Sequence, residues 1–94
     1  MEIKRKDHGT KGMFTAIEDG AQMGEMTYVW ADDDTIMIDH TEVSPQYEGR
    51  GIGKSMFMEA VKFAREKEIK IIPLCVFAKT MFERFPQTCD VLRS

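Results

Sequence analysis

Three alternate glycines, Gly49, Gly51 and Gly53, separate a strand-like segment from a helix-like segment. Glycine allows a sharp turn and leaves main-chain N–H groups accessible, because it has no Cβ. The helix that follows directs its unpaired N–H groups and the positive end of its dipole toward the same place. With Arg50 and Lys54 beside them, these glycines are typical of a site for a diphosphate. Any fold of this chain must therefore pass from a strand through a glycine turn into a helix N-terminus.

Antiparallel strands are predicted before the glycines. Residues 3–6 are expected to form a short edge strand, and the polar residues 8–12 a turn. Residues 13–17 are β-like and lead into Asp19-Gly20, a favourable hairpin turn, with a loop widened by Ala21-Gln22 as the alternative. The beginning of the chain thus predicts a strand, a turn and the first half of a hairpin.

Two further strands are predicted before the glycines. Residues 26–31 alternate with period two, which indicates a strand packed on both faces. Three successive aspartates end it, and residues 35–43 predict the next strand. Alternation places four side chains of that strand on one face: Ile36, Ile38, His40 and Glu42.

The hydrophobic period changes after the glycines. From Ile52 onward the apolar residues follow a helical spacing. Residues 69–74 predict a short strand, which should lie parallel to strand 35–43 because a helix separates the two. Residues 76–85 predict a second helix that Pro86 ends. In the tail, residues 87–94, Val91 and Leu92 are expected to pack on the core.

Length and charge limit the classes of function. The 94 residues predict a single domain spanning residues 1–94, and the net charge of −3 disfavours nucleic acid or an anionic membrane as partner. No run of about 18 apolar residues or export signal occurs, so a cytoplasmic protein is expected. Cys75 and Cys89 are expected to be free thiols, and no metal site is expected.

Two familiar phosphate-binding motifs do not fit the glycine stretch. A Walker A loop needs four residues between its first glycine and Gly-Lys-Ser, but only three separate Gly49 from Gly53. A dinucleotide fingerprint would require glycine where Lys54 stands, and a longer sheet than this chain can form. A strand-to-helix turn without a ligand remains the alternative.

Three residues near the glycines could take part in chemistry. His40 and Glu42 lie at the end of the strand that enters the turn, and either could accept a proton. Cys75 lies where the last strand meets a helix, whose dipole would favour a thiolate. The alternatives are a solvated histidine and glutamate and a buried apolar cysteine. Cys89 lies in the tail, where no polar constellation is predicted around it, and is interpreted as structural.

The order of elements and the segment Val43-Ser44-Pro45-Gln46-Tyr47-Glu48-Gly49-Arg50-Gly51-Ile52-Gly53 resemble the GCN5-related N-acetyltransferase (GNAT) superfamily. His40-Thr41-Glu42-Val43 and Pro73-Leu74-Cys75 are similar to its minimal, single-domain YjdJ-like subgroup. The resemblance implies an α+β, minimal GNAT-like fold: antiparallel strands, then a βαβ unit with a splayed parallel strand pair, and a C-terminal helix. It also implies acetyl-CoA as co-substrate.

The resemblance assigns roles to particular residues. The acetyl-CoA site would consist of Val43, Gly49, Arg50, Gly51, Ile52, Gly53 and Lys54. The catalytic candidates are Cys75, His40 and Glu42, with Cys75 and His40 favoured as a pair. Cys75 would accept the acetyl group or assist departure of the CoA thiolate.

The chain departs from the family pattern in three places. Glu48 stands where Gln or Arg is usual, Phe82 where larger members often have a tyrosine acid, and Phe85 where the subgroup has histidine. The helices that form much of the acceptor site in larger members are absent, so an open acceptor site is expected.

These observations favour an acetyl-CoA-dependent N-acyltransferase acting on a small-molecule or peptide amine. The missing tyrosine suggests an alternative, a CoA-binding module without catalysis. A small interaction domain, in which the glycines only turn the chain, is the third hypothesis.

Overall fold

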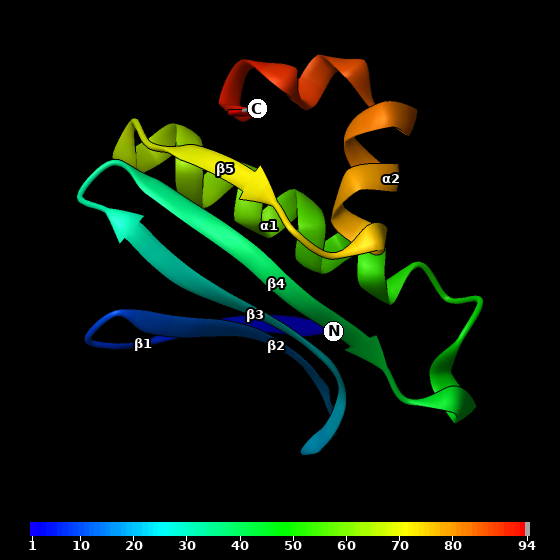
Figure 1. The fold of residues 1–94 in the computed structure, drawn as a ribbon. Helices are drawn as coiled ribbons and strands as arrows, with labels where there is room; N and C mark the ends of the chain where they lie inside the picture. The colour runs from blue at the N-terminus through cyan, green and yellow to red at the C-terminus, as the bar shows by residue number, and fades with distance from the viewer. Residues whose placement is uncertain (94) are drawn as a thin grey trace.

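The computed structural model describes residues 1–93 and shows one five-stranded sheet with two α-helices (Figure 1). The strands are β1 (Glu2–His8), β2 (Lys11–Glu18), β3 (Ala21–Asp32), β4 (Thr35–Val43) and β5 (Lys70–Pro73). The helices are α1 (Ile52–Lys67) and α2 (Val76–Arg84), with short 3₁₀ helices η1 (Pro45–Tyr47) and η2 (Pro86–Val91). The strands lie in sequence order, with β4 and β5 parallel and the others antiparallel. The predicted α+β fold with its βαβ unit is confirmed.

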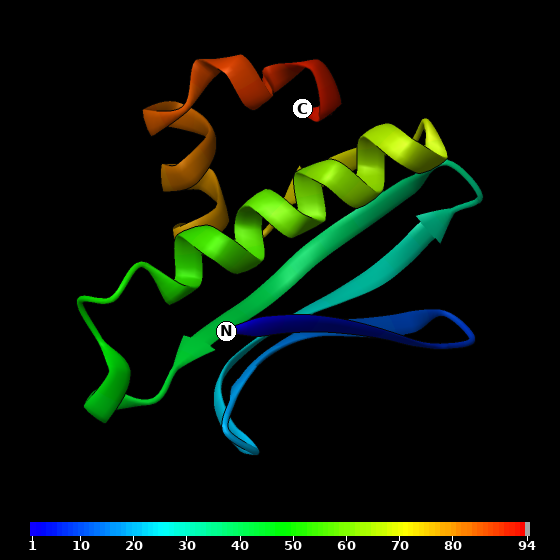
Figure 2. The ribbon, with the colours of Figure 1, turned by 180° about the vertical axis from the view of Figure 1, so that it is seen from behind.

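The sheet has one covered face and one open face. Helix α1 lies behind the sheet in Figure 1 and in front of it in Figure 2. Side chains of β2 and β3 alternate between buried and half-buried, so only the face toward α1 contributes fully to the core. The prediction that residues 26–31 pack on both faces was therefore wrong. Met26 and Tyr28 are buried, while Thr27 and Val29 are half-buried because no helix in residues 1–93 lies over them.

The first hairpin turn is tighter than predicted, and the second is the predicted Asp19-Gly20 pair. Only Gly9 and Thr10 join β1 to β2, so the expected turn at residues 8–12 was too long and both strands extend further. Asp19 and Gly20 join β2 to β3 with φ of +51° and +80°, the left-handed pair of a two-residue turn. Residues 21–22 belong to β3 and do not widen this loop, because the Asp-Gly pair closes the hairpin without further residues.

A β-bulge changes the faces of β4. Thr27 pairs with His40 and Tyr28 with Ile38, so Asp39 is an extra residue on β4. Partners across a pair of strands share a face. His40 therefore lies on the open face with Thr27, while Ile38 lies on the core face with Tyr28. The prediction that His40 and Glu42 share a face with Ile36 and Ile38 was wrong, because strict alternation fails at the bulge.

Helix α2 and the tail pack beside α1. The rings of Phe57 in α1 and Phe82 in α2 meet edge to face, with centroids 4.9 Å apart. Helix α2 ends at Arg84, one residue before the predicted end, and Val91 in η2 is buried while Leu92 packs on the core, as the sequence indicated. No helix in the described part of the chain is long and apolar enough to cross a bilayer.

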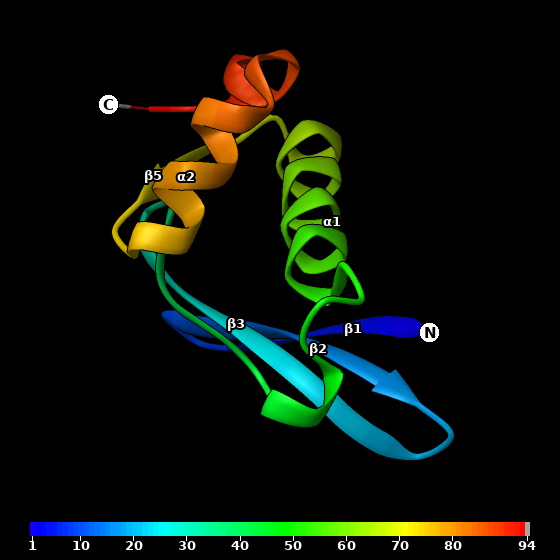
Figure 3. The same ribbon diagram turned by 90° about the vertical axis from the view of Figure 1, so that its right-hand side faces the viewer.

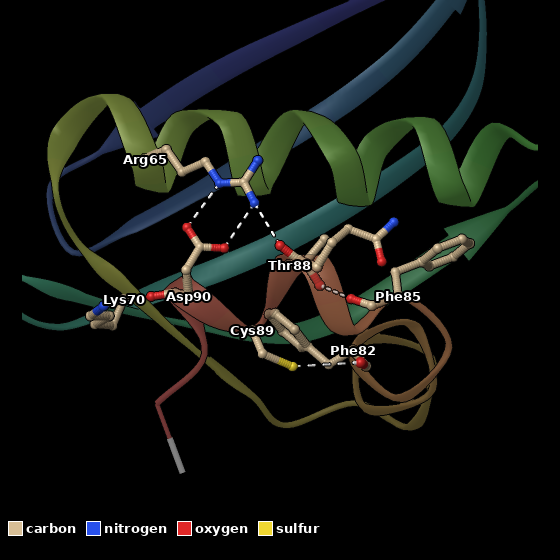
Figure 4. Close-up of polar contacts among 8 residues, drawn as sticks. Arg65, Lys70, Phe82, Phe85, Thr88, Cys89 and Asp90 are labelled. Carbon is tan, nitrogen blue, oxygen red and sulfur yellow. Dashed lines mark hydrogen bonds and ion pairs between the residues drawn. The ribbon is translucent and has the colours of Figure 1, made fainter.

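Arg65 fastens the tail to α1 (Figure 4). Its guanidinium donates two hydrogen bonds to Asp90, at 2.9 and 2.8 Å, and one to the carbonyl of Gln87 at 2.9 Å. The Arg93 amide then donates to the Ile71 carbonyl at 2.8 Å, beside a parallel bridge between Ile71 and Leu92. The tail thereby covers the outer edge of β5.

A polar cluster joins β1 to β3 at the end of the sheet where β4 begins. The Asp7 carboxylate accepts hydrogen bonds from Tyr28, Trp30 and Arg5, with 3.0 Å to each of the first two. The Arg5 guanidinium also lies 4.1 Å from the centre of the Phe63 ring. This cluster fixes the edge strand to the core.

Candidate active site

Strand β4 loses one of its neighbours halfway along. Strand β5 pairs with Thr35 to Ile38 and then diverges, and the amides of Leu74 and Cys75 both donate to the Ile38 carbonyl, at 2.9 and 3.2 Å. Figure 1 shows β4 continuing past the end of β5. From Asp39 to Val43 no strand within residues 1–93 pairs with β4 on that side. Free backbone groups along this edge can bind an extended ligand in the manner of an added strand.

The glycine turn lies at the end of this free edge. The chain passes through η1 and returns to the first turn of α1 (Figure 3). Gly49 and Gly51 have φ of +83° and +75°, so both positions favour glycine. Gly51 is the N-cap of α1, and its lack of a side chain leaves the first N–H groups of the helix uncapped. A Cβ at Gly51 would meet no atom within 4 Å, so a ligand has room to approach.

Gly53 has a different role from the other two glycines. It is buried in α1, and a Cβ there would lie 2.7 Å from Cζ of Phe77. Gly53 therefore allows the start of α2 to approach α1 closely. Its amide, with those of Ile52 and Lys54, belongs to the first turn of the helix, so its backbone can still contribute to an anion site.

The two cations of the turn have different partners, but both line one pocket beside Gly51. Arg50 forms an ion pair with Glu18 at 2.9 Å and lies 5.7 Å from the ring centre of Tyr47. The Lys54 ammonium lies 4.7 Å above the ring of Phe85. The guanidinium holds the pKa of Glu18 below its usual value by hydrogen bonding and charge. Both cations lie within a side chain's reach of the α1 N-terminus.

Cys75 is the N-cap of α2 at the point where β5 leaves β4. Its Sγ shares a hydrogen bond with Oγ1 of Thr41 at 3.6 Å, and the thiol is free and half-buried. Leu74 and Val76 on either side are 50% and 77% exposed, which is unusual for large apolar residues. The free β4 edge is thus bordered by a thiol and by exposed apolar surface.

His40 and Glu42 lie together on the open face of the sheet. Nε2 of His40 and Oε1 of Glu42 are 3.6 Å apart, and both side chains are mostly exposed. Thr41 between them points to the core face, toward Cys75. In the described residues no hydrogen bond joins His40 to Cys75. Two candidate bases therefore lie on one side of the free edge and the thiol on the other.

Val43 and Ile52, two predicted site residues, place their side chains against the core. Val43 packs on the core at the end of the free edge, and the Ile52 side chain is 3% exposed. The amide of Ile52 is the first backbone amide of α1.

The site combines two features that an extended ligand with a diphosphate would need. An uncapped helix N-terminus with an open approach suits a diphosphate, and a free strand edge suits the amide-bearing arm that leads to the thioester. The reacting end would then lie beside Cys75 on one side and His40 and Glu42 on the other.

Sequence reasoning missed two residues of this site. Strict alternation along β4 would place Thr41 on the face opposite Ile36 and Ile38, and the bulge at Asp39 places it on their face instead. Glu18 holds Arg50 from 32 positions away along the chain, a contact for which the local pattern gives no signal.

A model of the GCN5-related N-acetyltransferase family matches residues 13–91 of the chain. A GCN5-like protein from Staphylococcus aureus, solved by NMR, is 39% identical over 99% of this chain and 88% of its own, with a TM-score of 0.73. No curated protein matches significantly.

Larger acetyltransferases share the fold at lower identity. A GNAT acetyltransferase from Elizabethkingia anophelis with acetyl-CoA bound is 19% identical, with a TM-score of 0.60 over 67% of this chain and 42% of its own. The ribosomal-protein-S18-alanine N-acetyltransferase of Escherichia coli is 12% identical, with a TM-score of 0.71 over 84% of this chain and 54% of its own. This chain therefore spans about half of each. Together with the family match, the fold shows that the chain belongs to the GCN5-related N-acetyltransferase family.

Proposed function

We propose that this protein transfers an acetyl group from acetyl-CoA to an amine. The observation that carries the proposal is the free edge of β4 from Asp39 to Val43, which ends at the uncapped N-terminus of α1. This combination provides a place for an extended thioester arm and for its diphosphate. The family membership and the acetyl-CoA bound to a neighbour of the same fold support it.

The diphosphate would be held by backbone amides at Gly51, Ile52 and Gly53. The helix dipole and Lys54 add positive charge there, and Arg50 can turn from Glu18 toward a phosphate. Acetyl-CoA supplies an activated thioester carbonyl when bound. Free N–H groups of the β4 edge would hold that carbonyl for attack.

The two proton transfers of the reaction would take place on opposite sides of the free β4 edge. Attack of the amine forms a C–N bond, the C–S bond breaks, and the ammonium proton must leave. His40 or Glu42 on the open face would accept it, directly or through water. The departing thiolate would take a proton from Cys75, which Thr41 positions on the opposite side. Transfer through an acetyl-Cys75 intermediate uses the same contacts, with the thiol as first acceptor.

A screen of amines with acetyl-CoA, read by release of free thiol, tests the activity. Cys75→Ala should lose most turnover and keep its CoA affinity, because the thiol acts in chemistry and not in binding. Cys89→Ala is the matched control and should behave as wild type. Normal turnover of Cys75→Ala would remove the thiol from the mechanism.

Alkylation and mass measurement separate the two roles of Cys75. Iodoacetamide should modify Cys75 before the more exposed Cys89, because Cys75 lies at the N-terminus of α2, and CoA should protect Cys75. An added acetyl group on Cys75 after incubation without acceptor would establish the covalent route. No acetyl adduct with retained turnover would establish direct transfer, with His40 or Glu42 as base.

Binding of CoA is tested separately from turnover. CoA should shift the amide resonances of Gly49 to Lys54, and Glu48→Gln should keep or improve affinity because the backbone forms the anion site. Binding without turnover over the whole amine panel would favour a CoA-binding module. No amide shifts would favour an interaction domain.

A further inference from the structure

The open face of the sheet carries segregated charges. Strand pairing aligns side chains in rows across β1 to β4 on this face, one being Lys6, Met13, Thr27 and His40 and the next Lys4, Thr15, Glu25 and Glu42. Lys4 and Lys6 therefore lie on β1, whose first residue on this face is Glu2; neutral residues lie on the middle of the face, and carboxylates on its β3 and β4 side. Lys11, beside His8, extends the cationic side, and Asp39 extends the acidic side.

A groove of about 410 Å³ runs between these two sides. Its lining includes Lys6, His8 and Lys11 at one side, half-buried Met13 and Val29, and Asp39 at the other. The Asp39 carboxylate is fixed by a 2.7 Å hydrogen bond from Oγ1 of Thr27. In residues 1–93 no helix covers this groove (Figure 1). A ligand can therefore reach both charged sides at once.

The acidic side of the groove adjoins the free edge of β4. Asp39 begins that edge, and Glu42 lies further along it beside His40. An amine at physiological pH is a cation, so these carboxylates would attract it to the place where it must react. Lys11 lies two strands from Asp39 and Lys6 lies three, and strands are spaced by about 4.8 Å, which separates these lysines from Asp39 by about 10 to 14 Å.

We infer that the acceptor is a short zwitterion of peptide-like shape, with a free amine at Asp39 and Glu42 and a carboxylate at Lys6 and Lys11. The inference rests on the proposed function for the site of transfer. Charge complementarity supports a zwitterion and disfavours a diamine, because the second ammonium group of a diamine would lie against the lysines. An extended tripeptide spans about 10 Å from its amine to its carboxylate and so matches the shorter separation.

The test compares Gly-Gly-Gly with its C-terminal amide, which differs only in the terminal charge. In amide-resonance titrations at low salt, the tripeptide should shift Met13 and Val29 at several-fold lower concentration than the amide. Where turnover is measured, the tripeptide should have the lower KM. Equal shifts from both compounds, or none from either, would overturn the inference whatever the turnover.

Substitution of the two lysines tests where the carboxylate of the tripeptide binds. The double variant Lys6→Gln and Lys11→Gln should weaken the tripeptide about five- to tenfold and leave the amide unchanged, since exposed ion pairs are individually weak. Lys62→Gln with Lys67→Gln, on α1, removes the same charge and should change neither. An equal effect of both double variants would show a general field and contradict a lysine site.

These readouts separate the two proposals. Binding of Gly-Gly-Gly at the groove without thiol release would support the groove and contradict acyl transfer to this acceptor. Thiol release with amines, without preference for a carboxylate, would support acyl transfer and contradict the groove assignment.

Discussion

The two ends of β4 differ in how far their polar groups are paired. At the paired end, defined here by Thr35 to Ile38 with the neighbouring Asp7 cluster, β4 has strands on both sides and Asp7 has three donors. At the open end, defined by Asp39 to Val43, the glycine turn and Cys75, one side of β4 is free and α1 has no side-chain cap. Backbone N–H and C=O groups without a hydrogen-bond partner in the protein are found where a ligand can supply one. The paired end should therefore control stability and the open end binding.

The largest expected effect is on binding at the open end. Gly51→Val should weaken CoA at least about 100-fold, because a β-branched residue at φ of +75° would displace the amides proposed to make charge-assisted hydrogen bonds to the diphosphate. Gly9→Val is the matched control, since φ is +63° and a Cβ there also meets no atom within 4 Å. Both variants should lose similar stability in thermal unfolding. If calorimetry gave Gly51→Val the same CoA affinity as wild type, the assignment of the CoA site to this turn would be wrong.

A glycine at the paired end should show the opposite result. Gly12 lies against Tyr28, and a Cβ there would be 2.7 Å from Cε1 of the ring and closer still to Cζ. The ring is buried and held by Asp7 and Arg5, so Gly12→Ala should cost about 1–3 kcal/mol of unfolding free energy. CoA affinity should not change. A variant as stable as wild type would show that Tyr28 moves freely.

The order of elements could be predicted from the sequence, but several features of the site could not. Period-two and helical patterns are local, so they identified β4, α1, β5 and α2 within a few residues. The bulge at Asp39 depends on how β3 aligns with β4, which alternation in one strand does not contain. The reason for Gly53 lies in Phe77, on another helix. Non-local packing decided each of these.

Acid should weaken the paired end through Asp7. Burial would raise the pKa of this carboxyl, but hydrogen bonds from Trp30, Tyr28 and Arg5 outweigh burial and lower it below its ordinary value of 3.8. The folded state thus binds its proton less readily than the unfolded state, so the stability is present above about pH 4 and is lost as the pH falls through the folded pKa. In urea unfolding from pH 6 to pH 2, the advantage of wild type over Asp7→Asn should shrink. A constant difference would contradict the linkage.

The smallest expected effect concerns the tail. Its polar groups are hydrogen-bonded, as at the paired end, but they lie on the surface. Arg65→Ala removes the contacts to Asp90 and Gln87, and exposed ion pairs contribute little, so amide exchange at Arg93 should accelerate only a few-fold. Lys62→Ala, also exposed on α1, should leave that amide unchanged. CoA affinity should equal that of wild type, because the tail lies at the outer edge of β5, away from the free edge of β4. A loss of CoA affinity in Arg65→Ala would show that the two ends are coupled through α1 and that the division between stability and binding is incomplete.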